Sequence, residues 1–139
     1  MPIRVKNPGM FSSIQDLGRY GYSHLGISVV GAADRLSLRI ANLLVGNDEN
    51  APALEMTLLG ATLEFDERRM VALTGADCDA KVGTSLARSG EALEVPAGGV
   101  LKCGGMKTGA RCYLAIQGGF DVPTVMGSTA TDVRGGFGG

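Results

Sequence analysis

Residues 60–117 read GATLEFDERRMVALTGADCDAKVGTSLARSGEALEVPAGGVLKCGGMKTGARCYLAIQ and contain a series of short apolar segments bounded by Gly, Pro, Asp or Ser. The segments that this pattern predicts as strands are 62–65, 70–74, 80–82, 92–95, 100–103 and 110–117. Strands this short and closely spaced, with no helical pattern between them, indicate an antiparallel barrel or sandwich rather than a doubly wound sheet. The sequence therefore predicts a mainly β fold.

One helix is predicted upstream of this β region, at about residues 34–46. Its apolar residues recur at i, i+4, i+7 and i+8 and so share one helix face. These residues are Leu36, Ile40, Leu43 and Leu44. Asp34 is suited to be the N-cap and Gly46 to be the left-handed stop. Asp34 thus has a structural role open to it as well as a ligand-binding one.

The remaining N-terminal segments are less regular. Residues 3–5 alternate as a short strand, and residues 53–59 alternate weakly, with Glu55 interrupting an apolar run. Glu55 either faces water or points inward toward a charged partner, for which Arg19 or Arg39 would serve. Asn42, near the helix end, needs a hydrogen-bond partner if it is buried, and it could tie the helix to the loop before it.

That loop, residues 15–34, reads QDLGRYGYSHLGISVVGAAD and combines four glycines with charged and aromatic side chains. Glycines spaced in this way allow a folded loop rather than a regular element, and loops on a rigid scaffold often carry binding residues. A turn-rich connector held by an ion pair between Asp16 and Arg19 explains the same residues. The pattern leaves both interpretations open.

Composition excludes several classes of function. Apolar residues make up 45% and charged residues 19% of the 139, and the formal net charge is −1 without a basic run, so a nucleic-acid or anionic-membrane partner is not expected. No stretch has the length of a signal peptide core or a membrane span, and a cytoplasmic protein is expected. With one histidine and three cysteines that form no metal-binding spacing, no metal site is expected, and the thiols are predicted to be reduced and mostly in the core.

Several ordered motifs together resemble the allophanate hydrolase subunit 2 family, also called the biotin-dependent carboxyltransferase family or the family of the 5-oxoprolinase C subunit. They include Gln15-Asp16-Leu17-Gly18-Arg19-x-Gly21-Tyr22, Gly31-Ala32-x-Asp34, Ala41-Asn42-x-Leu44-Val45-Gly46-Asn47, Ala53-Leu54-Glu55, Leu73-Thr74-Gly75-Ala76, Tyr113-Leu114-Ala115 and Thr131-Asp132. The resemblance spans nearly the whole chain, but members of the family are considerably longer. Residues 1–139 are therefore expected to be a single domain, the N-terminal portion of such a protein with the C-terminal part missing.

The resemblance implies a cyclophilin-like β-barrel with one principal helix, and a smaller homologous subunit as partner. It implies a role in an ATP-dependent 5-oxoprolinase complex that hydrolyses 5-oxoproline to glutamate, with a third, lactam-hydrolase subunit. The alternatives are the carboxyltransferase component of a biotin-dependent urea carboxylase or allophanate hydrolase system, and a non-catalytic regulator of a histidine kinase. No covalently bound cofactor is expected: ATP would be used by the complex, and biotin would be carried by a partner.

These chemistries need cations and fixed donors near developing negative charge. Arg19 is the first candidate, because its planar fork can hold a carboxylate in two hydrogen bonds. Gln15 and Tyr22 could donate to a carbonyl oxygen, and Asp16 could orient Arg19, although the same residues could simply lock the loop. The full set of predicted substrate-binding residues is Gln15, Asp16, Arg19, Tyr22, Asp34, Asn42, Glu55 and Asp132. No catalytic residue is assigned.

Overall fold

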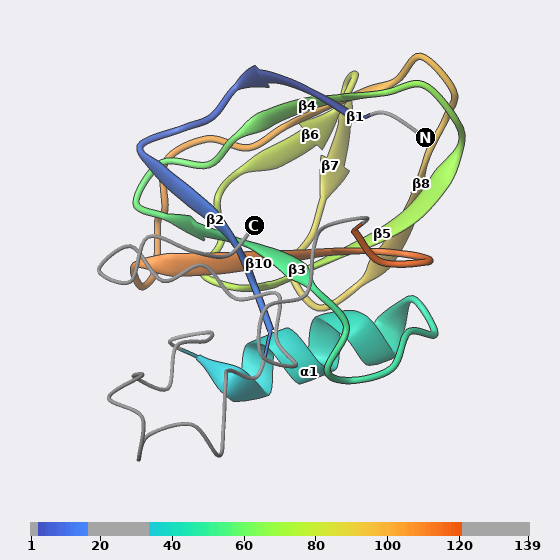
Figure 1. Ribbon diagram of the computed structural model, residues 1–139. Coiled ribbons are helices and arrows are strands. Elements are labelled where there is room, and N and C mark those ends of the chain that lie inside the picture. Colours follow the sequence, from blue (N-terminus) through green and yellow to red (C-terminus); the bar gives the residue numbers. More distant parts are fainter. Residues whose placement is uncertain (1–2, 17–33, 121–139) are drawn as a thin grey trace, which may run out of the picture.

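The computed structural model describes residues 3–16 and 34–120, which form ten strands and one helix (Figure 1). The elements, in chain order, are β1 (Ile3–Asn7), β2 (Phe11–Gln15), α1 (Arg35–Leu44), β3 (Ala53–Thr57), β4 (Thr62–Phe65), β5 (Arg69–Gly75), β6 (Ala80–Val82), β7 (Ser85–Ala87), β8 (Ala92–Val95), β9 (Val100–Lys102) and β10 (Arg111–Ile116). The prediction of a mainly β fold with one principal helix is confirmed.

The strands form two antiparallel sheets of five. The first has the order β1-β4-β9-β6-β7 and the second the order β2-β3-β10-β5-β8. In the second sheet, β10 lies in the centre, and its register places Tyr113 opposite Glu55 of β3 and opposite Thr74 of β5. The two sheets face each other and enclose the main core between them, as Figure 1 shows.

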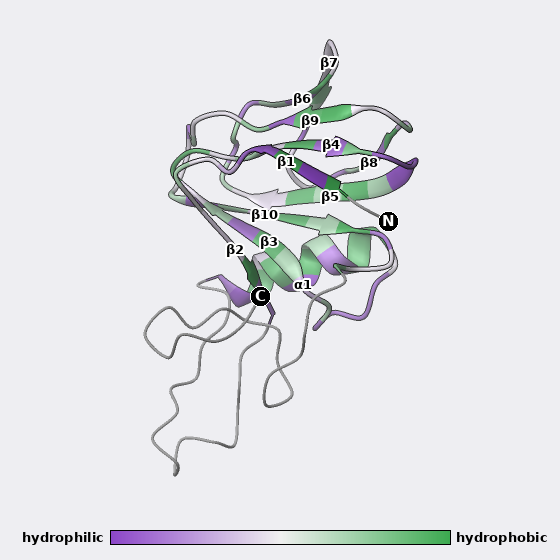
Figure 2. Cartoon of the chain, turned by 45° about the horizontal axis from the view of Figure 1, so that its top comes forward, coloured by the Kyte–Doolittle hydropathy of each residue, from purple (hydrophilic) through white to green (hydrophobic). Residues whose placement is uncertain are grey.

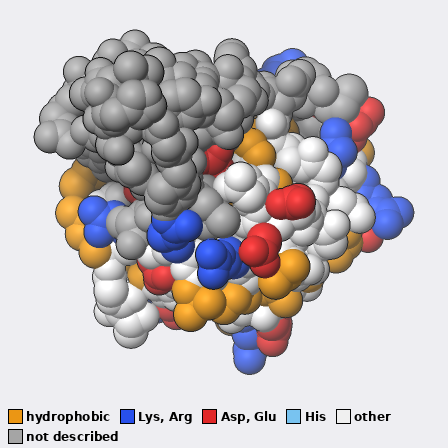
Figure 3. All heavy atoms as spheres, turned by 60° about the horizontal axis from the view of Figure 1, so that its bottom comes forward, with side chains coloured by type: hydrophobic (Ala, Val, Ile, Leu, Met, Phe, Trp, Pro, Cys, Tyr) orange, Lys and Arg blue, Asp and Glu red, His pale blue; other side chains and the backbone are white. Residues whose placement is uncertain are grey.

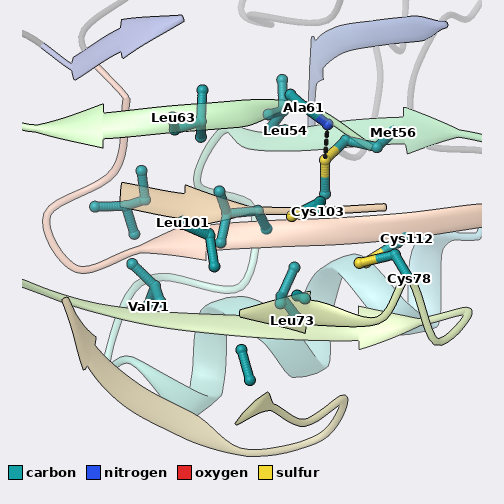
Figure 4. Packing of buried hydrophobic residues seen from close by; sticks show 14 of the residues in the cluster. Leu54, Met56, Ala61, Leu63, Val71, Leu73, Cys78, Leu101, Cys103 and Cys112 are labelled. Atoms are coloured by element: carbon teal, nitrogen blue, oxygen red, sulfur yellow. Dashed lines mark hydrogen bonds between the residues drawn. The ribbon is translucent and has the colours of Figure 1, made fainter. Parts of the chain in front are cut away.

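Alternation along each strand sends the larger apolar side chains into this core (Figure 4). Cys112, Leu114 and Ile116 of β10 share the core face. The three cysteines are free and buried, which confirms their predicted place, and the sulfur atoms of Cys78 and Cys112 are 3.8 Å apart. Because the interior is filled by medium-sized aliphatic and thiol side chains, the low aromatic content of the chain is no obstacle to close packing.

Helix α1 covers the outer face of the second sheet, where it packs on β10 and β5 (Figure 2). The sheet presents small residues to the helix in a row across three strands, Ala53, Ala115 and Ala72. Their small side chains let the helix approach closely, with Leu38 and Ala41 filling the space. A second, smaller core therefore lies between α1 and the sheet.

The helix face that packs inward is not the one that the apolar spacing indicates. The buried helix residues are Leu38, Ala41 and Asn42, followed by Val45 at the C-cap. The four aliphatic residues at i, i+4, i+7 and i+8 lie on the opposite side and are exposed; they are Leu36, Ile40, Leu43 and Leu44. The four residues share one face, as the spacing predicts, but that face points away from the sheet. The sequence carries two apolar stripes, and the alanine-lined sheet packs against the one with smaller side chains.

The predicted boundaries of the helix and strands agree with the structure in part. The helix begins after Asp34 and ends at Leu44, and Gly46 takes the predicted left-handed conformation with φ of +77°. However, Gln15 is not a loop residue, since it closes strand β2 opposite Ala53. Strands β2 and β7 escaped prediction because their serines weaken the apolar alternation. Within the part of the chain that the structure describes, no helix has the length and hydrophobicity that crossing a membrane requires.

Candidate functional site

A row of polar side chains crosses the second sheet on the face that carries α1. The strand register aligns Ser13 of β2 with Glu55 of β3, Glu55 with Tyr113 of β10, and Tyr113 with Thr74 of β5. The row lies next to the alanine row, directly below the beginning of α1. Four strands far apart in sequence thus bring hydroxyl and carboxylate groups to one end of the helix.

The hydroxyl of Tyr113 is the centre of this row. Tyr113 is fully buried; its hydroxyl accepts a hydrogen bond from the backbone N–H of Asp34 at 2.8 Å and donates one to Oε2 of Glu55 at 2.6 Å. Burial, followed by the bond to Glu55, raises the pKa of Tyr113 well above its usual 10. The hydroxyl therefore keeps its proton and fixes both the start of α1 and the orientation of Glu55.

Two further side chains secure the first turn of α1. The hydroxyl of Thr74 donates to the carbonyl oxygen of Ser37 at 2.6 Å. The carboxylate of Asp34 accepts from the backbone N–H of Ser37 at 3.1 Å and from its hydroxyl at 2.6 Å. These bonds, first that of the Ser37 side chain, lower the pKa of Asp34 below its ordinary 3.8. Asp34 is thus the N-cap that the sequence predicts.

Replacing this cap has a defined, pH-dependent cost. We expect Asp34→Ala to destabilise the protein by about 1 kcal/mol at pH 7, and Asp34→Asn by much less, because asparagine is an equally good N-cap. Since the pKa of Asp34 is lowered on folding, its contribution is present above pH 3.8 and is lost as the pH falls through the folded-state value. Urea unfolding at pH 7 and pH 3 checks both statements. Asp48→Ala, which removes a hydrogen bond to Asn50 outside the helix, is the control.

A charged pair stands beside Tyr113. Glu55 points inward, with its side chain 12% exposed, and its Oε1 lies 4.0 Å from Nε of Arg111, whose side chain is 45% exposed. Among the described residues the cation beside Glu55 is Arg111 rather than Arg39, because Arg111 begins β10 two residues before Tyr113 and shares its strand face. Glu55 holds Tyr113 on one oxygen and faces a guanidinium with the other.

A pocket of about 370 Å³ opens beside this pair. Its described lining runs from Asp34 at the start of α1 to the ends of β5 and β10. The lining residues are Asp34, Gly75, Ala76, Thr108, Gly109, Ala110 and Arg111. Gly75 has φ of +87°, and a Cβ there would lie 2.7 Å from the carbonyl oxygen of Arg111, so a side chain does not fit. The pocket offers a half-exposed guanidinium, a hydroxyl and glycine backbone to a small polar ligand.

Gln15 and Asp16 lie at the other end of the polar row. Both are buried, with 6% and 3% of their surface exposed. The amide nitrogen of Gln15 donates to the hydroxyl of Ser13 at 2.9 Å, while its buried Oε1 has no hydrogen-bond partner among the described residues. A buried acceptor without a donor is costly, so this oxygen is available to an N–H group of a ligand.

Asn42 lies away from this site, near the other end of α1. It is fully buried and its amide nitrogen donates to the carbonyl oxygens of Glu49 and Ala51 at 3.2 and 2.8 Å. Its geometry is that of a residue that holds the turn after the helix. Arg19, Tyr22 and Asp132, also predicted as substrate-binding residues, lie outside the described residues.

Five residues of the site were not predicted from the sequence: Ser13, Ser37, Thr74, Tyr113 and Arg111. Only Arg111 and Tyr113 could have been found from the sequence pattern, because they share the face of β10 that lies opposite its core-facing apolar side chains. A tyrosine and an arginine on the second face of a central strand indicate a functional or partly polar surface. The serines and Thr74 become visible only through the strand register.

The fold and the site define a class: a β domain of two packed sheets in which the one helix of the described residues borders a pocket with a partly polar lining. Residues 25–139 match the family model described as carboxyltransferase domain, subdomain A and B. The chain belongs to this family.

Two relatives are named as the C subunit of 5-oxoprolinase. The protein of Escherichia coli (strain K12) is 48% identical over 137 residues, which is 99% of this chain and 44% of the relative. The protein of Haemophilus influenzae is 41% identical over 92% of this chain and 41% of the relative. The urea amidolyase of Saccharomyces cerevisiae is 38% identical over 99% of this chain but only 8% of its own length. The chain thus spans less than half the length of these curated relatives.

Solved structures agree with this placement. The crystal structure of TTHA0988 superposes with a TM-score of 0.93 at 33% identity and covers 98% of this chain and 51% of that one. The urea amidolyase of K. lactis superposes with a TM-score of 0.90 at 38% identity and covers 93% of this chain and 8% of that one. The two-sheet fold with one helix is therefore shared by members of the family in different chain contexts.

Proposed function

We propose that this chain is part of a subunit of an ATP-dependent 5-oxoprolinase complex, which opens the lactam of 5-oxoproline to give glutamate. The observation that carries the proposal is the 48% identity to the 5-oxoprolinase C subunit of E. coli over nearly the whole chain. The identity to the urea amidolyase is ten percentage points lower over a similar length, 48 against 38. The better match therefore favours the lactam as substrate.

The site at the start of α1 suits such a molecule. 5-Oxoproline has a carboxylate, a ring carbonyl and a ring N–H. Arg111 is half-exposed in the pocket, so its guanidinium can bind the carboxylate. Glu55, held by Tyr113, balances that charge and keeps Arg111 at the pocket edge. Gln15 does not line this pocket, because the register places it beside Ala53, two strands away from Arg111.

The proposed partners are a smaller homologous subunit and a lactam-hydrolase subunit. The word subunit in the names of two relatives supports a complex of several chains. In that complex ATP would be consumed as a co-substrate, and the residues described for this chain would bind and orient the lactam. Arg19, Tyr22 and Asp132 remain proposed members of the same site on the sequence motifs alone.

A second candidate is the carboxyltransferase step of a biotin-dependent urea carboxylase. Three relatives named urea amidolyase or putative urea carboxylase, 37–38% identical to this chain, favour it. In that case a partner domain would carry biotin, and Arg111 would face the carboxyl group being transferred. The two candidates share the pocket and differ in the molecule that enters it.

One experiment separates them. The full-length protein is combined with its two proposed partner subunits, and ATP-dependent glutamate formation from 5-oxoproline is measured beside urea-dependent ATP consumption with a biotin carboxylase present. We expect turnover of 5-oxoproline only when this protein is included. Activity with urea and none with 5-oxoproline would replace the first proposal by the second.

A further inference from the structure

An apolar stripe runs along the outer side of α1 and is independent of the pocket. Its members are the helix residues Leu36, Ile40, Leu43 and Leu44, which are 64%, 41%, 59% and 37% exposed. Single exposed leucines are common on protein surfaces, but four aliphatic residues in one continuous stripe over a ten-residue helix mark an interaction surface. Figure 3 shows hydrophobic side chains gathered with charged ones on this side of the molecule.

Apart from the N-cap Asp34, the charges in and just after α1 are distributed against the helix dipole. Residues 34–42, the N-cap and most of the helix, contain Asp34, Arg35 and Arg39 and sum to +1. Residues 43–51, the last two helix residues and the turn that follows, contain Asp48 and Glu49 and sum to −2. The first turn contains no acidic residue and the last turn no basic one. Cations near a helix N-terminus and anions near its C-terminus are unfavourable within one helix. The same arrangement becomes favourable when a second helix lies antiparallel beside it.

We propose that a second copy of this chain docks on the stripe, with the two α1 helices antiparallel across a twofold axis. A twofold contact uses the same patch on both copies, so the four aliphatic residues of one copy meet those of the other. The positive beginning of each helix then lies beside Asp48 and Glu49 of the other copy, and the two helix dipoles oppose each other. A single twofold contact thus buries the apolar stripe and also pairs the opposite charges of the two copies.

The patch is small, and this sets the strength of the contact. Interfaces below about 1,200 Å² of total buried area belong to weak complexes. We therefore expect a reversible dimer that forms in the micromolar range rather than a permanent one. Because Asp34 is bound to Ser37, its charge opposes the pairing less than that of Arg39 favours it.

Sedimentation or light scattering of the full chain between 1 and 500 µM tests the proposal. We expect the average mass to rise toward twice the monomer mass, and Ile40→Gln with Leu43→Gln to abolish the rise. Leu86→Gln is the matched control, since Leu86 is 57% exposed on β7 of the other sheet and should leave the dimer unchanged. Circular dichroism confirms that the variants remain folded.

A charge exchange tests the orientation. Glu49→Arg alone should weaken the dimer at least tenfold, and Glu49→Arg combined with Arg35→Glu should restore most of it, since each arginine again meets an acid of the other copy. A monomer at all concentrations, a dimer insensitive to the Gln variants, or no recovery in the exchanged pair would overturn the proposal. A monomer whose Gln variants lose binding to a proposed partner subunit would assign the stripe to that subunit instead.

Discussion

Tyr113→Phe is expected to destabilise the protein by roughly 2–3 kcal/mol, although it removes a single oxygen atom. The hydroxyl satisfies two partly buried groups at once, the N–H of Asp34 and the carboxylate of Glu55. A buried polar group left without its partner costs about 1–3 kcal/mol, and more when the group is charged. For a protein of this size the loss corresponds to a fall in melting temperature on the order of 5–10 °C, which calorimetry would detect.

The effect also has a pH signature. Because the pKa of Tyr113 is raised on folding, its contribution to stability is complete below pH 10 and is lost as the pH rises further. The difference between wild type and Tyr113→Phe should therefore narrow above about pH 10. Thr62→Val is the control, since it removes a half-buried hydroxyl from the other sheet that serves none of the hydrogen bonds found among the described residues. Equal losses in both variants would contradict a special role for Tyr113.

The strands of this fold were predictable because their signal is local. Each apolar segment of residues 60–117 is bounded at both ends by Gly, Pro, Asp or Ser. The alternation of apolar and polar side chains within a segment follows directly from strand geometry, in which successive side chains point to opposite faces. The helix ends were predictable for the same reason: Asp34 and Gly46 act on backbone groups within one turn. These features need no knowledge of the rest of the chain.

The orientation of α1 was not predictable, because the sequence of a helix with two apolar stripes does not indicate which stripe is buried. The choice depends on the small side chains of Ala53, Ala72 and Ala115, which three strands bring together only in the folded sheet. Helix position is therefore decided by the complementary surface, and spacing alone identifies an apolar face without assigning its partner.

The candidate site was predictable only in part for a similar reason. Gln15, Asp34 and Glu55 stand out by residue type, yet their relation to each other depends on the register of β2, β3, β10 and β5. Tyr113, the residue that joins Asp34 to Glu55, is 58 positions from Glu55 and 79 from Asp34 in the sequence. No local pattern indicates contacts over such separations.

We propose that the pocket at the start of α1 binds the substrate carboxylate through Arg111. The most direct measurement is the KM for 5-oxoproline of the reconstituted complex containing Arg111→Ala. A hydrogen bond to a charged group contributes about 1.5–3 kcal/mol, so KM should rise about 10- to 100-fold. Arg111→Lys should recover little, because an ammonium group lacks the planar fork.

Stability separates binding from folding in this measurement. Losing the half-exposed pair with Glu55 should cost at most about 1 kcal/mol, so Arg111→Ala should melt close to wild type. Arg4→Ala is the matched control, since Arg4 also lies 4.0 Å from a glutamate but belongs to β1 of the other sheet. We predict a raised KM for Arg111→Ala and an unchanged KM for Arg4→Ala; wild-type kinetics in Arg111→Ala would contradict the account.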